Sequence, residues 1–207
     1  MYLLLDEQWA HQLSLCALMR QAAEQGVSLF QYRCKDISMS HAYAQARKLV
    51  EVAREMAVCF IVNDRCDLAL AVEADGVHVG QQDLPALFAR QLLGPDKIVG
   101  LSTHNAEEIL AIPEGQVDYI GFGPIFQTGT KANHDPIVGI NGLQSVRALT
   151  SLPLFAIGGI SPESVFSLVS AGANGVAVAS AVLGAGDSGK VMTQFLASFS
   201  QANLTIE

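Results

Sequence analysis

Three polar residues at alternate positions, Gln31, Arg33 and Lys35, continue an apolar run that begins at Val27. Successive side chains of a β-strand point to opposite faces, so these three would all point the same way. Two of them are cations, and a buried cation is costly unless an anion pairs with it. If this strand is central in the fold, the row predicts an anion-binding site.

Two carboxylates, Asp64 and Asp83, follow the next two apolar runs of the chain. Magnesium is usually held by one or two carboxylates together with water and substrate phosphate. Taken alone, Asp64 is better explained as the cap of a following helix, a very common role for aspartate. Because Arg33 and Lys35 are expected nearby, we favour a metal that binds a diphosphate. Asp75 lacks this placement and is interpreted as a surface charge.

Glycines and hydroxyls mark the later part of the chain, at Gly158-Gly159 and at Ser180. Backbone N–H groups at such turns bind phosphate, although glycine also serves simply to permit a tight turn. The stretch Thr128–Lys131 supplies hydroxyls, open backbone and a cation, which fits either a lid or an ordinary surface loop. His104 could be an acid or a base, and a structural hydrogen-bond role is equally common. His78 is interpreted as a packing residue inside a strand.

Short apolar runs alternate with longer amphipathic ones along the whole chain, and this predicts strands that alternate with helices. The expected strands are Tyr2–Leu5, Leu29–Arg33, Cys59–Val62, Gly76–Val79, Ile98–Leu101, Tyr119–Phe122, Leu154–Ile157 and Val176–Val178. In the helix after the second strand, an apolar stripe is expected at Tyr43, Ala46, Leu49, Val50 and Ala53.

Eight strand–helix repeats predict an α/β fold, a closed (β/α)8 TIM barrel. A doubly wound open sheet is the alternative, although no Gly-x-Gly-x-x-Gly follows an early strand. In a barrel the carboxyl ends of all strands meet on one rim, so the polar clusters above would meet there. We expect residues 1–207 to form a single domain, with a long active-site loop at about 123–139.

The overall charge limits the partners. The chain has 12 basic and 20 acidic residues and a net charge of −8, which argues against nucleic acid and membrane surfaces. The four cysteines form no Cys-x-x-Cys pair and no zinc spacing, which suits free thiols in a reducing compartment. The N-terminus does not have the pattern of a signal peptide. We therefore expect a cytoplasmic protein with small phosphorylated substrates, and a homo-oligomer is left open.

Several stretches together are specific for one family. They are Gln31–Lys35, Val62–Ala69, Ala74–Pro85, Gly100–His104, Asp118–Lys131, Ala156–Ile160 and Gly175–Ala181. Over nearly its full length the chain resembles the thiamine-phosphate synthase (thiamine-phosphate pyrophosphorylase) family. The resemblance implies a transferase of thiamine biosynthesis that uses Mg²⁺. Such an enzyme joins 4-amino-5-hydroxymethyl-2-methylpyrimidine diphosphate to hydroxyethylthiazole phosphate, giving thiamine phosphate and diphosphate.

The resemblance also implies roles for individual residues. The pyrimidine diphosphate would be bound by Gln31, Arg33, Lys35, Asn63, Ser102 and Lys131. The thiazole phosphate would be bound by Thr128, Gly129, Thr130, Gly159, Ala179 and Ser180. Mg²⁺ would be bound by Asp64 and Asp83. The groups expected to act in catalysis are Arg33, Lys35, Lys131 and Ser102.

Two other functions on the same barrel compete with this one. A thiazole tautomerase would use the same thiazole phosphate loops, with His104 as proton carrier, but it needs no diphosphate–metal site. A non-catalytic protein that binds a thiamine intermediate would not need to stabilise a leaving group. The joint presence of five residues argues against the tautomerase: Arg33, Lys35, Asp64, Asp83 and Lys131. The metal pair argues against the binding protein.

Overall fold

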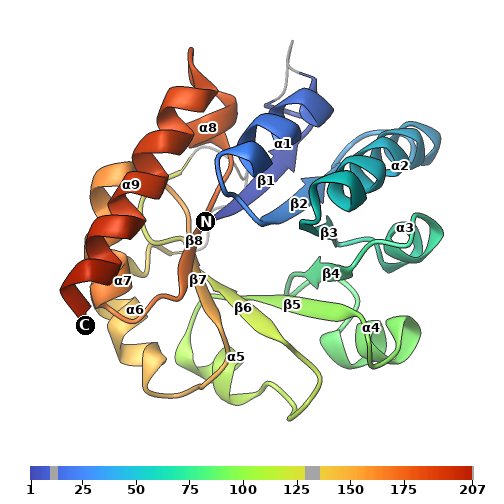
Figure 1. Ribbon diagram of the computed structural model, residues 1–207. Coiled ribbons are helices and arrows are strands. Elements are labelled where there is room, and N and C mark those ends of the chain that lie inside the picture. The colour runs from blue at the N-terminus through green and yellow to red at the C-terminus, as the bar shows by residue number, and fades with distance from the viewer. Residues whose placement is uncertain (10–13, 129–135, 207) are drawn as a thin grey trace.

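Eight parallel strands close into a barrel in the order of the sequence, in a computed structural model that describes residues 1–9, 14–128 and 136–206 (Figure 1). The strands are Tyr2–Asp6 (β1), Leu29–Arg33 (β2), Cys59–Asn63 (β3), Gly76–Val79 (β4), Ile98–Thr103 (β5), Tyr119–Phe122 (β6), Leu154–Ile157 (β7) and Gly175–Val178 (β8). The barrel closes where β1 pairs with β8, at Tyr2 opposite Ala177. The predicted (β/α)8 barrel is thus confirmed, and the open sheet is wrong.

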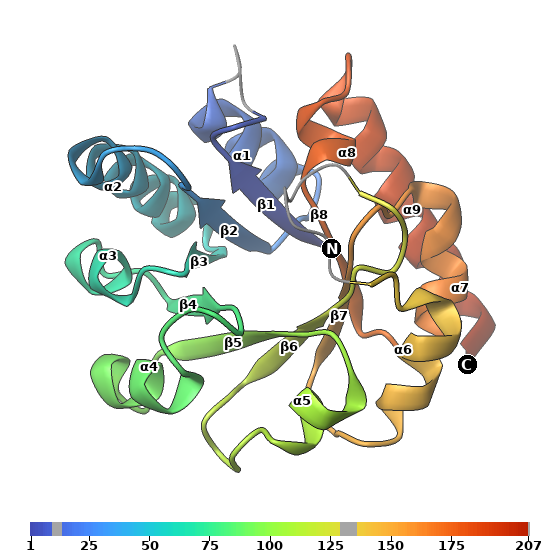
Figure 2. The same cartoon turned by 180° about the vertical axis from the view of Figure 1, so that it is seen from behind.

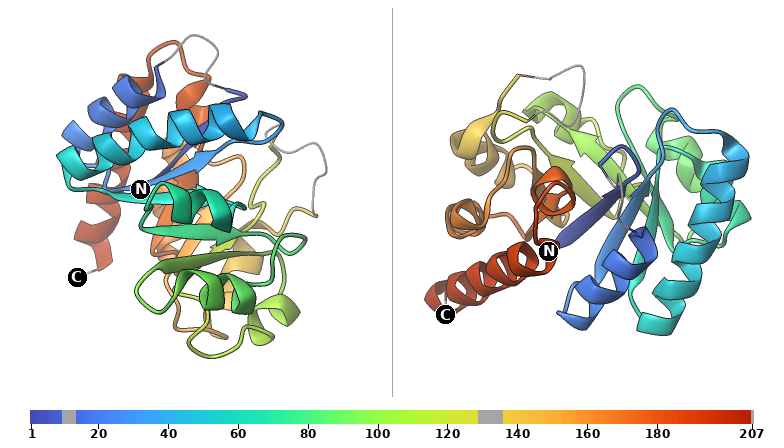
Figure 3. Two further views of the ribbon diagram at one scale, coloured as in Figure 1. Left: turned by 90° about the vertical axis from the view of Figure 1, so that its right-hand side faces the viewer. Right: turned by 90° about the horizontal axis from the view of Figure 1, so that it is seen from above.

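Helices cover the outside of the barrel on all sides, as the two opposite views show (Figures 1 and 2). They are Leu15–Glu24 (α1), Met39–Met56 (α2), Cys66–Ala71 (α3), Ala86–Leu93 (α4), Ala106–Leu110 (α5), Gly139–Arg147 (α6), Val165–Ser170 (α7), Ser180–Leu183 (α8) and Ser188–Ile206 (α9), with a 3₁₀-helix at Pro162–Ser164. The short α8 follows β8 directly, and α9 then completes the outer layer (Figure 3). Among the described residues, no helix has the length and apolar character that crossing a bilayer requires.

The main hydrophobic core lies between the strands and this outer layer. In α2 the predicted stripe is buried at Ala46, Leu49, Val50 and Ala53, whereas Tyr43 is exposed at the edge of the helix. A smaller apolar cluster fills the inside of the barrel, where Tyr2, Tyr119 and Phe155 pack edge to face. Towards the carboxyl ends of β2 to β5, polar side chains line the inside of the barrel instead, at Arg33, Asn63, His78 and Ser102.

A repeated hydrogen-bond clamp fixes the amino ends of the strands. An aspartate or asparagine stands just before each of β4, β6 and β8, and its side chain accepts from a backbone N–H of the strand before it. The three bonds are Phe60 N–H to Asp75 (2.7 Å), Val99 N–H to Asp118 (2.6 Å) and Leu154 N–H to Asn174 (2.9 Å). Asp75 is exposed, as expected of a surface charge, and its carboxylate also serves as a structural acceptor.

Arginines from the last turns of two helices reinforce the clamp. Arg90 of α4 donates to Asp118 at 2.5 Å, and Arg147 of α6 donates to Asn174 at 3.2 Å. Each arginine also donates to backbone carbonyls of the following loop. The clamp lies at the amino ends of the strands, the end of a barrel where residues serve stability rather than chemistry.

We predict that Asp118→Ala lowers the free energy of unfolding by about 1–3 kcal/mol, because it leaves the Val99 N–H and the Arg90 guanidinium without their shared acceptor. Urea denaturation followed by circular dichroism measures the change. Asp67→Ala is the matched control, since it removes an exposed carboxylate paired with Arg65 and should cost at most about 1 kcal/mol. Equal losses in the two variants would contradict the clamp.

Candidate active site

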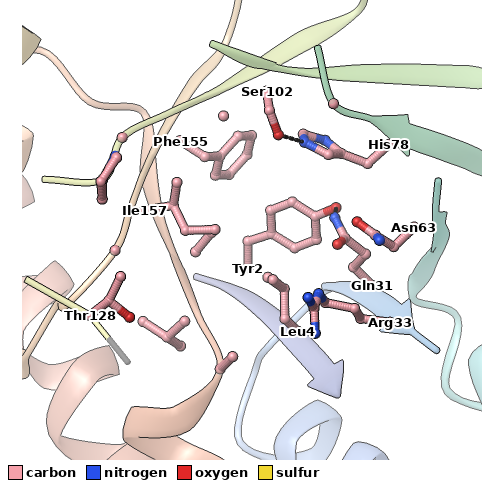
Figure 4. Close-up of a pocket in the computed structure, with 18 of the residues that line it drawn as sticks. Tyr2, Leu4, Gln31, Arg33, Asn63, His78, Ser102, Thr128, Phe155 and Ile157 are labelled. Carbon is pink, nitrogen blue, oxygen red and sulfur yellow. Dashed lines mark hydrogen bonds between the residues drawn. The ribbon is translucent and has the colours of Figure 1, made fainter. Parts of the chain in front are cut away.

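A cavity of about 410 Å³ opens at the carboxyl ends of the strands. Every predicted site residue that the structure describes lines it: Gln31, Arg33, Lys35, Asn63, Asp64, Asp83, Ser102, Thr128, Gly159, Ala179 and Ser180. Gly129, Thr130 and Lys131 lie outside the described residues. Polar side chains gather on one side of the cavity, and Phe155 and Ile157 face them from the other (Figure 4).

Arg33 is anchored by a buried ion pair. Its Nη1 lies 2.6 Å from Oδ2 of Asp6, and the two side chains are 9% and 0% exposed. The register of β1 and β2 sets Asp6 beside Arg33, so the pair follows directly from strand pairing. Since one buried aspartate already compensates it, Arg33 can remain charged inside the barrel without a ligand. Asp6 was not among the predicted site residues, and its place at the end of an apolar run was the available signal.

Lys35, Asp64 and Asp83 form a second charged group nearer the rim. The Lys35 ammonium lies 3.3 Å from the Asp64 carboxylate, and Asp83 accepts a hydrogen bond from the Gly80 N–H at 2.8 Å. Asp64 has a left-handed backbone with φ of 62°, which is uncommon outside glycine and is frequent at functional sites. The N-cap residue of α3 is Arg65 rather than Asp64, so the helix-cap interpretation of Asp64 is wrong.

The electrostatics of this group fit a divalent cation. Burial raises the pKa of Asp64, contact with Asp83 raises it further, and Lys35 opposes both effects. Two carboxylates in contact on a half-buried wall repel each other, and a hard cation between them would relieve the repulsion. In the part of the chain that the structure describes, no set of three metal-binding side chains exists. A cation here would therefore take its other ligands from water or a substrate phosphate.

A chain of hydrogen bonds crosses the floor of the cavity. Gln31 Nε2 donates to the Tyr2 hydroxyl, which contacts the Tyr119 hydroxyl, and His78 connects Tyr119 to Ser102. Tyr2 and Tyr119 were not among the predicted site residues, and His78 was interpreted as a packing residue only. The signal was in the alternation of each strand, because Tyr119 and His78 occupy inward positions.

The two glycines after β7 are required by close packing. Gly158 and Gly159 have φ of 99° and 64°, and a Cβ on Gly159 would lie 2.4 Å from the carbonyl oxygen of Gln127. The first residues of the loop after β6 hydrogen bond to this turn, with Phe126 N–H donating to the Gly158 carbonyl at 3.0 Å. This loop extends from the end of β6 to Gly139 at the start of α6. The beginning of the loop is therefore fixed against the turn after β7.

His104 lines the cavity and is held by Glu108. Its Nδ1 lies 3.0 Å from Glu108 Oε2, and its backbone N–H donates to the same oxygen at 2.7 Å. This double contact fixes the start of α5 and fits the structural interpretation of His104.

Comparison with known proteins identifies a family. A family model described as thiamine monophosphate synthase matches residues 1–182. Thiamine-phosphate synthase of Moorella thermoacetica is 44% identical over 170 residues, which are 82% of this chain and 81% of that protein. Thiamine-phosphate synthase of Synechocystis is 46% identical over 93% of this chain, which spans 56% of that longer relative.

The fold has a close match among solved structures. Thiamine phosphate pyrophosphorylase from Pyrococcus furiosus superposes with a TM-score of 0.86 at 31% identity, covering 97% of this chain and 95% of that one. Both comparisons agree with the resemblance drawn from the sequence.

We predict a pH dependence of stability caused by Asp64 in metal-free protein. Because its pKa is raised above the ordinary value of 3.8, the folded state binds more protons than the unfolded chain in this window. The free energy of unfolding should therefore fall as pH rises from about 3.8 through the raised pKa of Asp64. Asp64→Asn should flatten this fall, as measured by urea denaturation with chelator between pH 4 and 7.

Asp67→Asn is the control of opposite sign. The hydrogen bond from Arg65 lowers the pKa of Asp67, so this residue stabilises the fold above its ordinary pKa and loses that effect as pH falls. The Asp64 prediction fails if Asp64→Asn leaves the slope between pH 4 and 7 as it is in the wild-type protein.

Proposed function

This chain belongs to the thiamine monophosphate synthase family, and we propose that it joins the pyrimidine diphosphate to the thiazole phosphate to form thiamine phosphate. One observation supports this most strongly. A single cavity has cations and paired carboxylates on one part of its rim, at Lys35, Asp64 and Asp83, and glycine-rich turns on another. Two different phosphate groups could therefore bind at once, as a condensation of two phosphorylated substrates requires.

We assign the diphosphate to the β2 side of the cavity. Lys35 is 46% exposed and can turn from Asp64 to a phosphate oxygen, whereas Arg33 acts from a fixed position beside Asp6. Asn63 and Ser102 add polar groups to the same wall. Lys131, which lies outside the described residues, is proposed as a further cation on the loop after β6.

Asp64 and Asp83 would hold Mg²⁺, which when bound supplies positive charge next to the diphosphate. Their contact with each other and the raised pKa of Asp64 support this assignment. A bound cation would also release Lys35 from its pairing with Asp64, because the carboxylate would then be neutralised by the metal.

The proposed reaction is a dissociative substitution. The bond between the pyrimidine methylene carbon and the diphosphate oxygen breaks, and its electron pair leaves with the diphosphate. Arg33 and Lys35 stabilise the charge that develops on this leaving group. The aminopyrimidine stabilises the resulting carbocation, and the thiazole nitrogen then donates its lone pair to form the new C–N bond. Phe155, Ile157 and Ile160 line the cavity with apolar surface, which limits the access of water to the cation.

We assign the thiazole phosphate to the turns after β7 and β8. Gly159 exposes its backbone at the cavity, and Ala179 and Ser180 stand at the start of the short helix α8. This is the region of a (β/α)8 barrel that often binds phosphate through backbone N–H groups. Thr128 lines the cavity nearby, and Gly129 and Thr130 are proposed to continue this site. Holding the phosphate here would keep the thiazole nitrogen close to the cation.

We also propose a cytoplasmic location. All four cysteines are unpaired, which suits a reducing compartment. The proposed substrates are small charged molecules. The net charge of −8 argues against nucleic acid and membrane surfaces as partners.

The deciding experiment mixes purified protein with both precursors and Mg²⁺ and detects thiamine phosphate by mass spectrometry. We expect thiamine phosphate and diphosphate in equal amounts. Thiazole tautomerisation without coupling would identify a tautomerase instead. Tight binding of a precursor without turnover would identify a binding protein. A boiled sample controls for uncatalysed coupling.

We predict that Lys35→Met lowers kcat by about 10²–10³-fold, because it removes one preorganised charge from the leaving group. Lys48→Met is the matched control, since Lys48 is exposed on the outer helix α2 and its loss should leave kcat unchanged. Steady-state kinetics compare the two variants. If circular dichroism shows that Lys35→Met is unfolded, or if the folded variant keeps the wild-type kcat, a role for Lys35 in the reaction is not supported.

A further inference from the structure

We infer that Tyr119 is a positioning residue that acts through His78 to make the Ser102 hydroxyl a hydrogen-bond donor toward the cavity. The part of this inference that concerns substrate rests on the proposed function. The part that concerns proton order rests on the structure alone. Tyr119 itself lies below the cavity wall and is nearly fully buried.

Five side chains from five strands form one continuous chain of hydrogen bonds. The contacts are Gln31 Nε2 to Tyr2 Oη (2.5 Å), Tyr2 Oη to Tyr119 Oη (2.7 Å), Tyr119 Oη to His78 Nδ1 (2.9 Å) and His78 Nε2 to Ser102 Oγ (2.9 Å). Figure 4 draws the last of these contacts and shows Gln31 beside Tyr2. All members except Ser102 are buried, so each proton needs a partner within the protein.

The amide of Gln31 sets the direction of the whole chain. It donates to Tyr2, so the single hydroxyl proton of Tyr2 is directed to Tyr119. Once Tyr119 accepts the Tyr2 proton, its own hydroxyl proton has the Nδ1 atom of His78, 2.9 Å away, as its acceptor, and we infer that Tyr119 donates there. A neutral imidazole that accepts at Nδ1 carries its proton at Nε2, and His78 therefore donates to Ser102.

Glycines in the neighbouring strands leave room for this chain. Gly100 of β5 stands in register between His78 of β4 and Tyr119 of β6. A Cβ on Gly100 would lie 2.4 Å from the Tyr119 hydroxyl oxygen and 2.5 Å from His78 Nδ1. The hydrogen bond between His78 and Tyr119 thus crosses β5 at Gly100, and only glycine leaves room for it there.

The consequence is a fixed polar pattern on the cavity wall. Because Ser102 accepts from His78, its own proton is directed to a ligand in the cavity. Gln31 lines the same cavity, and its amide carries a carbonyl oxygen that can accept a hydrogen bond. A wall with one donor and one acceptor suits a heteroaromatic ring that carries a ring nitrogen next to an amino group. A site of this kind strongly disfavours analogues that lack the matching group.

The direct test is the tautomer of His78 in the free protein. Nuclear magnetic resonance of ¹⁵N-labelled histidine distinguishes a proton at Nε2 from one at Nδ1, and we expect Nε2–H in the wild-type protein. In Tyr119→Phe the donor to Nδ1 is lost, and a mixture of the two tautomers should appear. We further expect KM for the pyrimidine diphosphate to rise about 10- to 100-fold in this variant while KM for the thiazole phosphate stays unchanged.

Tyr32→Phe is the matched control. Tyr32 is also a buried tyrosine, but its hydroxyl donates to Glu7 at 2.9 Å and takes no part in the chain of hydrogen bonds from Gln31 to Ser102. It should change neither the His78 tautomer nor either KM.

The inference is overturned if wild-type His78 carries its proton at Nδ1, or if Tyr119→Phe alters both KM values equally. The wild-type spectrum decides the proton order even if Tyr119→Phe does not fold. Absence of thiamine phosphate from the wild-type reaction, with Nε2–H present, would reject the proposed function and leave the proton order standing.

Discussion

The polar row on β2 is the constraint on which the rest of the site depends, since three polar side chains enter a barrel and each must be compensated. The barrel supplies a separate partner to each: Tyr2 to Gln31, Asp6 to Arg33, and Asp64 to Lys35. Exposure rises along the row, from the buried Gln31 and Arg33 to the half-exposed Lys35. The two deep residues are therefore fixed by the fold, and only the outermost is free to exchange its partner.

This gradient explains how one strand can serve both stability and chemistry. The ion pair between Arg33 and Asp6 is buried, and separating the two side chains would leave two uncompensated charges inside the barrel. The Lys35–Asp64 pair is wetter and is weakened by the proximity of Asp83, which raises the pKa of Asp64. The ion pair between Lys35 and Asp64 is therefore weak. A cation bound to the carboxylates, or a phosphate bound to Lys35, could replace it at little cost. The site is most easily rearranged at the point where ligands would enter.

The sequence predicted those parts of the site that depend on local order. The period of two in β2 gives a shared face for Gln31 and Arg33, and Lys35 follows in the turn after the strand. The position of Asp64 and Asp83 after apolar runs gives their place on the rim. Local order can place Asp6 at the end of an apolar run and Tyr119 on an inward face, but it does not give their partners, because these depend on pairing between strands. Asp6 meets Arg33 through the register of β1 and β2, and Tyr119 meets His78 only because Gly100 separates them. Such contacts require the closed barrel and its register, which periodicity along one strand does not specify.

The clamp at the amino ends of the strands connects these two levels of organisation. Asp118 binds the Val99 N–H of β5 and immediately precedes Tyr119, so it fixes the height at which Tyr119 enters the barrel. Asp75 binds the Phe60 N–H of β3 and stands three residues before His78, and it fixes β4 in the same way. A shift of one residue in either strand would turn its polar side chain out of the barrel. The hydrogen-bond chain that ends at Ser102 is therefore positioned from the far end of the barrel, by residues that have no contact with the cavity.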